Sequence, residues 1–240
     1  MIMKKSIEKV VAQVIISISF LLIAGTAFGQ LDMMEYRSYD DFLTNQEKSL
    51  LQRSILKVSD IEGSPYLDKS FVKGSVITRD SIQYQNVPLR YNVYNDEFEF
   101  KVDEEKYLVI SEPASILQIR IEDAVFIYLK KDNKYGYYQL LNDDKIKLLL
   151  RYNVKFRQAN VTNGINQARP PKFNRGSDTY YLQIGYNEPQ QIKNKKDINL
   201  IFGSKNNTIQ ELIKKEKLDV RKEGDLLKFV KLLNTSDLIK

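Results

Sequence analysis

The sequence predicts an α+β protein, in which an antiparallel β-sheet body, built as a meander of hairpins, precedes a small C-terminal helical appendage. Three observations carry this prediction. Apolar and polar residues alternate along two long stretches, Val87–Val102 and Lys145–Arg157. Short apolar segments separated by turn residues fill the chain from Phe71 to Ile184. After these strands, helical patterns follow Asn187-Glu188-Pro189, so a run of strands precedes a run of helices.

Four segments are predicted along the chain. Residues 1–29 are expected to be a signal peptide, and residues 30–62 a lead-in with one helix between Asn45 and Ile55. Residues 63–190 are expected to form the antiparallel β domain, and residues 191–240 a helical segment packed on or beside the sheet.

The N-terminus has the three-part composition of a secretory signal peptide. Basic residues precede Val10–Gly25, an apolar run that is short for a membrane-spanning helix, and Ala27-Phe28-Gly29 offers small residues before a cut at Gln30. A retained N-terminal anchor is the alternative. We therefore expect an exported protein, in the periplasm or on the periplasmic face of the outer membrane, without a membrane span in its mature form.

The composition excludes several kinds of catalytic centre. The chain has no His, Cys or Trp, which rules out a Ser-His-Asp triad, a Cys-His dyad, an imidazole-bound zinc site and a disulfide. Glu97 and Glu99 form a carboxylate pair, but alternation places both opposite Phe98 and Phe100, and hence in water. We predict no catalytic residue, no metal site and no cofactor.

The Val87–Val102 stretch predicts a hairpin. Its apolar residues occupy odd positions up to Val93 and even positions from Phe98, and such a change of parity indicates a turn. With Asn95-Asp96 as a two-residue loop, the predicted cross-strand pairs are Val93 with Phe98, Tyr91 with Phe100 and Leu89 with Val102.

The Lys145–Arg157 stretch predicts one strand with an apolar face and a basic face. Six even positions are apolar, and most odd positions are Lys or Arg. Arg169, Lys172 and Arg175 continue the basic character into the loop that follows. The candidate binding residues are Lys147, Arg151, Lys155, Arg157 and Arg175. Their predicted partner is anionic: an envelope component such as lipopolysaccharide phosphates, or an acidic surface of an outer-membrane protein. An ordinary solubilising surface is the alternative.

Charge is distributed unevenly along the chain. Residues 30–150 contain 16 Lys+Arg and 21 Asp+Glu, whereas residues 151–240 contain 18 and 9. The C-terminal part is therefore basic by nine charges, which fits an anionic partner or the acidic part of the same chain. Nucleic acid is not expected as a partner of an exported protein.

The pentamer LRYNV occurs twice, at Leu89–Val93 and Leu150–Val154. It indicates either a duplicated strand or two strand ends with similar requirements, since the flanking residues do not align. Arg90 and Arg151 are each expected to reach a carboxylate or to remain solvated.

Three helices are predicted in the C-terminal segment. Lys195–Phe202 ends at Gly203, a residue suited to a helix C-terminus. Thr208 and Glu211 have the spacing of a capping box, and Lys222–Leu233 is amphipathic.

Five segments of the chain resemble a family of signal-peptide-bearing exported proteins of Bacteroidota that has no assigned activity. They are GSPYLDKSFVKGSVI, VPLRYNVYNDEFEF, IKLLLRYNVKF, KFNRGSDTYYL and KKDINLIFGSKNNTIQELIKKEKLDVRKEGDLLKFVKLLN. The resemblance covers residues 63–234. It implies export and a compact body, and it transfers no catalytic residue.

Together these features predict a non-catalytic binding or structural role in the cell envelope. One alternative is a hydrolase that uses carboxylates or a Ser/Lys pair on envelope glycan or lipid. Another is an accessory subunit docked on an outer-membrane complex. A deep pocket with clustered carboxylates would favour the hydrolase, and a flat basic face would favour binding.

Overall fold

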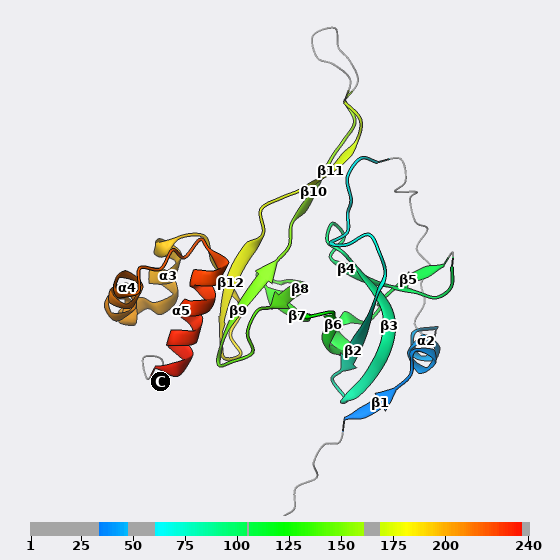
Figure 1. The fold of residues 1–240 in the computed structure, drawn as a ribbon, viewed down its shortest axis with the longest axis horizontal. Coiled ribbons are helices and arrows are strands. Elements are labelled where there is room, and N and C mark those ends of the chain that lie inside the picture. Colours follow the sequence, from blue (N-terminus) through cyan, green and yellow to red (C-terminus); the bar gives the residue numbers. More distant parts are fainter. Residues whose placement is uncertain (1–33, 48–60, 105, 161–168, 237–240) are drawn as a thin grey trace, which may run out of the picture. The chain divides into compact units, whose positions relative to one another are not determined.

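The computed structural model describes residues 34–47, 61–104, 106–160 and 169–236 (Figure 1). The chain divides into two units, Met1–Met34 and Glu35–Lys240, and every element below belongs to the second. The predicted signal peptide lies outside the described residues, as does most of the helix predicted between Asn45 and Ile55.

The predicted fold class is confirmed: the described residues form a mostly antiparallel sheet, with most of the helices late in the chain. The strands are β1 (Glu35–Arg37), β2 (Val72–Thr78), β3 (Ile82–Asn92), β4 (Glu97–Lys101), β5 (Tyr107–Val109), β6 (Ile116–Ile121), β7 (Ala124–Lys131), β8 (Lys134–Leu140), β9 (Ile146–Arg151), β10 (Val154–Arg157), β11 (Lys172–Arg175), β12 (Thr179–Ile184) and β13 (Gln190–Ile192). The helices are α2 (Tyr39–Glu47), α3 (Lys195–Phe202), α4 (Asn206–Lys215) and α5 (Glu223–Thr235), with short 3-10 turns η2 (Pro113–Ser115) and η3 (Gly203–Lys205).

The main sheet of the described residues consists of two meanders. Its order is β13-β12-β9-β8-β7-β6-β2-β3-β4-β5, so β2–β5 and β6–β9 each run in sequence and meet where β2 pairs with β6. β1 adds to β3 in parallel. β10 and β11 leave this sheet and form a separate two-stranded ribbon.

An aromatic core shows that the sheet curls on itself. Phe98 of β4 lies 5.1 Å from Phe126 of β7 and 4.8 Å from Tyr137 of β8, measured between ring centroids. Three strands separate β4 from β7 in the sheet, so these rings meet only because the sheet bends around them. Helix α2 also packs here, since Phe42 is fully buried against Tyr84 and Phe100.

A second core lies where the C-terminal helices cover the other end of the sheet. Ile146 and Leu148 of β9 and Leu182 of β12 are buried together with Phe229 and other apolar residues of the helices. Ile146 and Leu148, at even positions of β9, therefore face the helices, as predicted for an apolar strand face.

The helices begin and end largely where the sequence predicts. Helix α3 spans Lys195–Phe202, with Gly203 at φ 50° as its C-cap. Its N-terminus is closed by a capping box between Asn194 and Asp197. The capping box predicted at Thr208 is wrong, because α4 already begins at Asn206 and Thr208 lies inside its first turn.

The β3–β4 hairpin has a longer loop than the sequence predicts. Leu89 is opposite Phe100 and Tyr91 is opposite Phe98, which leaves residues 93–96 as the turn. The predicted pairing is therefore wrong by two residues. Because the error is even, the apolar residues keep their predicted face, and Tyr91, Phe98 and Phe100 are all buried.

Polar contacts explain the longer loop. The Asn92 side-chain oxygen accepts a hydrogen bond from the backbone N–H of Asn95 at 3.1 Å. The N–H of Tyr94 donates to the carbonyl oxygen of Pro65 at 3.1 Å, and Asp96 adopts φ 58°. Asp tolerates this left-handed conformation better than most residues.

The single strand predicted over Lys145–Arg157 is two strands. β9 ends at Arg151, and β10 begins at Val154 in the ribbon. The Asp178 carboxylate accepts a hydrogen bond from the backbone N–H of Asn153 at 3.2 Å, and the Gly176 N–H donates to the Asn153 carbonyl oxygen at 2.8 Å. Because these bonds occupy the N–H and carbonyl groups of Asn153, this residue does not continue the β9 ladder within the sheet.

Candidate functional site

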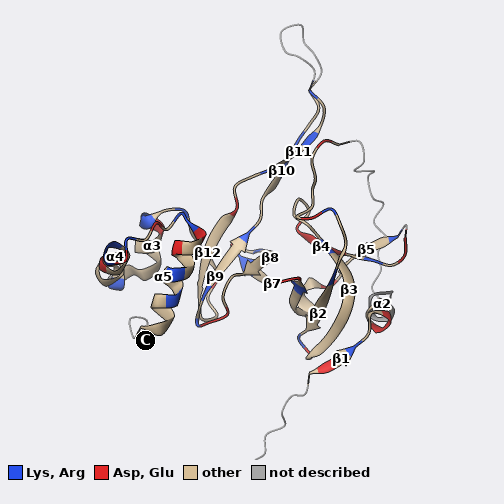
Figure 2. Ribbon diagram, viewed as in Figure 1, with Lys and Arg blue, Asp and Glu red and all other residues tan. Residues whose placement is uncertain are grey.

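The β10–β11 ribbon has one cationic face. Its register places Arg157 directly opposite Lys172 and Lys155 opposite Asn174, and alternation puts these four side chains on the same face. Residues 154–175 contain five Lys+Arg and no Asp+Glu. Figure 2 shows Lys and Arg on both ribbon strands. We call Lys155, Arg157 and Lys172 the ribbon face.

The cations of the ribbon face are incompletely neutralised within the described part of the chain. Like charges directly opposite each other destabilise an antiparallel pair, and Arg157 and Lys172 are such a pair. Lys172 forms an ion pair with Glu62. Arg157 donates to the carbonyl oxygen of Pro170 at 3.4 Å, and both Arg157 and Lys155 are exposed.

The opposite face of the ribbon is apolar near its base and holds the ribbon to the body. Phe156 and Phe173 lie 5.1 Å apart between ring centroids, and Tyr94 from the β3–β4 turn lies 5.2 Å from Phe173. Glu62 runs beside β11, since the Phe173 N–H donates to the Glu62 carbonyl oxygen at 2.8 Å. The ribbon face is thus supported from behind by packed side chains.

The structure brings only part of the predicted basic face together. Lys155 and Arg157 share the ribbon face, and Lys172, which the sequence placed in the following loop, joins them. Lys147 and Arg151 lie on β9 in the main sheet. Arg175 is on the apolar side of the ribbon, opposite Val154.

The other three candidates are held by carboxylates and rings. Lys147 pairs with Asp143. The Arg175 guanidinium is 2.8 Å from the Asp178 carboxylate and 4.7 Å from the centroid of the Tyr152 ring. Both ion pairs are local, and each one neutralises a cation that would otherwise be available to an anionic ligand.

Arg151 belongs to a network around Asp96. The Asp96 carboxylate accepts hydrogen bonds from Arg151 Nη2 at 2.9 Å, from the Tyr91 hydroxyl at 2.6 Å and from the backbone N–H of Tyr137 at 3.2 Å. Burial and the nearby Asp96 carboxylate raise the pKa of Tyr91 well above its ordinary value. Arg151 is therefore a structural residue of the sheet.

The expectation that Glu99 faces water is wrong. Glu99 is only 4 % exposed, and its carboxylate accepts hydrogen bonds from Arg90 Nη2 at 2.5 Å and from Asn92 Nδ2 at 3.1 Å. The Arg90 guanidinium lies 3.7 Å from the Tyr66 ring centroid and 4.2 Å from that of Phe71. The segment before β2 covers this side of the hairpin, so Glu99 serves as the counter-ion of Arg90. Both LRYNV arginines thus reach a carboxylate.

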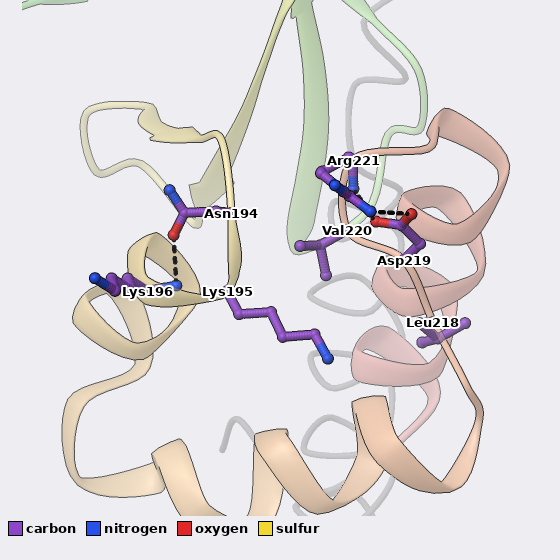
Figure 3. Close-up of a pocket in the computed structure, with 7 residues that line it drawn as sticks. All are labelled: Asn194, Lys195, Lys196, Leu218, Asp219, Val220 and Arg221. Atoms are coloured by element: carbon purple, nitrogen blue, oxygen red, sulfur yellow. Dashed lines mark hydrogen bonds and ion pairs between the residues drawn. The ribbon is translucent and has the colours of Figure 1, made fainter.

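A shallow hollow of about 530 Å³ lies beside the N-terminus of α3 (Figure 3). Its lining residues are Asn194, Lys195, Lys196, Leu218, Asp219, Val220 and Arg221. Asn194 caps the helix, and Arg221 is 2.9 Å from the Asp219 carboxylate, which lowers the pKa of Asp219 to about 2. Asn194, Asp219 and Arg221 are thus bonded within the lining of the hollow.

Two further findings concern the described ranges only. No three acidic side chains in them lie close enough together to hold a metal ion. None of their helices combines the length and apolar character needed to cross a membrane.

Comparison of the chain with protein-family models, with curated proteins and with solved structures finds no match.

Proposed function

We propose that this protein is a non-catalytic binding protein of the cell envelope, and that the ribbon face contacts the phosphate groups of an anionic lipid surface. The export part of the proposal rests on the signal-peptide composition of the residues before Gln30. The binding part rests on the ribbon.

The single observation that carries the proposal is the pairing of Arg157 with Lys172 on a strand pair without acidic residues. Two cations placed opposite each other destabilise the strand pair by repulsion. Glu62 offsets the charge of Lys172 but not that of Arg157, and an external anion would neutralise both cations. The apolar side chains behind the ribbon fix the backbone that carries the cations, so the backbone of the ribbon need not be ordered on binding.

A lipid surface suits this arrangement better than a single acidic side chain. Phosphate groups are repeated across such a surface, and Lys155 and Arg157, two residues apart on one strand, are separated by about 6.7 Å. Each Lys or Arg near an anionic bilayer contributes about 1 kcal/mol of binding free energy. The three cations of the ribbon face would then contribute about 3 kcal/mol, or on the order of 100-fold in affinity.

The test is a salt titration of binding to vesicles that contain phosphatidylglycerol. Exposed charges are screened beyond about 8 Å at physiological ionic strength, so affinity should fall steeply as salt rises. Vesicles of phosphatidylcholine alone are the uncharged control. Equal binding to both kinds of vesicle, or binding that salt does not change, would overturn the proposal. Binding to an acidic protein but to neither vesicle would replace the lipid surface by a protein partner.

A further inference from the structure

The ribbon face already holds an anion from its own chain. Glu62 lies beside Lys172 in a parallel bridge, and its carboxylate forms an ion pair with the Lys172 ammonium group. The backbone fixes this position, because the Glu62 N–H donates to the Pro171 carbonyl oxygen at 3.3 Å and the Glu62 carbonyl oxygen accepts from Phe173. A carboxylate is therefore placed at one of the two opposed cations.

Resting on the proposed function, we propose that Arg157 and Lys172 together form a clamp for a single phosphomonoester, and that Glu62 is the built-in competitor that the phosphate displaces. The side chains of directly opposed residues start about 4.5–5.5 Å apart at their Cβ atoms. The terminal oxygens of one phosphate group can then accept hydrogen bonds from both cationic heads. Arg157 supplies the planar fork that binds phosphate in a bidentate manner.

The charge of the clamp selects the ligand class. With Glu62 displaced, the clamp presents two positive charges at one point. A phosphomonoester carries a charge of about −1.5 to −2 at pH 7, since its second pKa is about 6. A phosphodiester or a carboxylate carries only one charge. The ligand should therefore be a phosphomonoester headgroup of a lipid.

Displacing Glu62 costs little because the pair that it forms is exposed. The side chains of Lys172 and Glu62 are 34 % and 55 % exposed, and exposed ion pairs of this kind contribute weakly to stability. The backbone bonds of Glu62 do not depend on its carboxylate. The substitution Glu62→Gln should therefore leave the ribbon folded while removing the competing charge.

A matched control exists elsewhere in the chain. Glu104 pairs with Lys101 at 2.9 Å, with 33 % of the lysine side chain and 96 % of the glutamate side chain exposed. Glu104→Gln removes the same charge and opens the same kind of ion pair, but on the turn between β4 and β5. Any effect of net charge alone should appear equally in both variants.

The experiment measures binding of the protein to vesicles containing phosphatidic acid, a phosphomonoester, or phosphatidylglycerol, a phosphodiester. We expect Glu62→Gln to tighten binding to phosphatidic acid about two- to fivefold, as expected for an exposed ion pair. Glu104→Gln should change it less. In a Lys172→Gln background, Glu62→Gln should have no effect, because the two residues act on the same site. Binding to phosphatidic acid should also strengthen as pH rises through the second ionisation of the phosphate.

The competitor role of Glu62, the phosphomonoester clamp and the proposed function are tested by different outcomes. Equal effects of Glu62→Gln and Glu104→Gln would overturn the competitor role of Glu62. Equal affinity for the two lipids, with no pH dependence, would overturn the phosphomonoester clamp while leaving the proposed function standing. If neither vesicle binds the wild-type protein, the proposed function fails and this inference fails with it.

Discussion

Asp96 and Arg151 are 55 residues apart in sequence, and their side chains meet at 2.9 Å, joining the β3–β4 turn to strand β9. β8 pairs with β9 only at Gln139 and Leu140, so the Tyr137 N–H is not used in that ladder. Asp96 accepts this N–H as well as the guanidinium. The turn of the first LRYNV segment is thus fastened to the arginine of the second.

Replacing Asp96 by Asn should destabilise the protein by roughly 1.5–3 kcal/mol, the usual value for a hydrogen bond to a charged group. Asn tolerates the φ of 58° found at this position, so the substitution removes the charge without straining the backbone. Asp123→Asn, on the exposed β6–β7 turn, is the matched control. Denaturant unfolding measures both, and equal midpoints would show that the pair is of no structural importance.

Gly136 gives a second test of the same pair. A Cβ at this position would lie 2.5 Å from Asp96 Oδ2 and 2.6 Å from Arg151 Nη2. Gly136→Ala should therefore destabilise the wild-type protein. In an Asp96→Ala, Arg151→Ala background the crowding is gone, and the same substitution should be neutral or stabilise by up to about 1 kcal/mol, because Ala is favoured over Gly within a strand. The same sign in both backgrounds would contradict the packing described.

Glu99→Ala should be costly, in contrast to what strand alternation predicts. Removing one partner of a buried ion pair leaves an uncompensated charge, and the expected loss is about 3–5 kcal/mol. Phe100→Ala should cost a similar amount through the cavity that it leaves. Thermal unfolding compares the two variants. A loss below about 0.5 kcal/mol for Glu99→Ala would restore the exposed position that sequence alone indicates.

The stability of the protein should be nearly constant from about pH 6 to 9 and fall at alkaline pH. The chain has no His and no Cys to titrate in the neutral range. Burial, followed by the hydrogen bond to Glu223, raises the pKa of Tyr180 to about 12. Burial also raises the pKa values of Tyr91 and Tyr137.

The sign of this change in stability with pH follows from the number of protons that the folded and unfolded states bind. Above about pH 10 the unfolded state loses tyrosine protons that the folded state keeps, so the free energy of unfolding decreases as pH rises. Tyr180→Phe should make this decrease smaller between pH 10 and about 12. Unfolding midpoints measured across this range, together with tyrosine absorbance, provide the check. A midpoint that does not fall above pH 10 would contradict the burial of these hydroxyls.

Export makes a separate prediction. The mature protein isolated from the envelope fraction should begin at or within two residues of Gln30. N-terminal sequencing decides this, and an intact Met1 would favour the retained anchor.

Local pattern was sufficient for the features that depend on neighbours in sequence. The bounds of α3 follow from its amphipathic run and from Gly203, and the buried face of the β3–β4 hairpin follows from alternation. The number of loop residues does not follow, because Asn92 and Pro65 supply the bonds that open the turn.

The burial of Glu99, the division of the predicted basic strand and the make-up of the ribbon face depend on contacts between segments that are distant in sequence. Alternation assigns one face of β4 to water, but Tyr66 and Phe71 cover Arg90 on that side. The predicted basic strand divides at Asn153 because Asp178, 25 residues later, binds its backbone N–H. This division separates Lys155 and Arg157 from Arg151, and only the ribbon register shows that Lys172 stands opposite Arg157.

The most direct test of the ribbon face compares two triple variants with the same net charge. One is Lys155→Gln, Arg157→Gln, Lys172→Gln, and the other is Lys193→Gln, Lys196→Gln, Lys214→Gln, which changes three exposed lysines of the helical segment. The measurement is the ratio of their dissociation constants for vesicles containing phosphatidic acid at low salt. We predict that the ribbon variant binds on the order of 100-fold more weakly, with an unchanged unfolding midpoint. A ratio near one would show that the ribbon face is ordinary surface and does not bind the lipid.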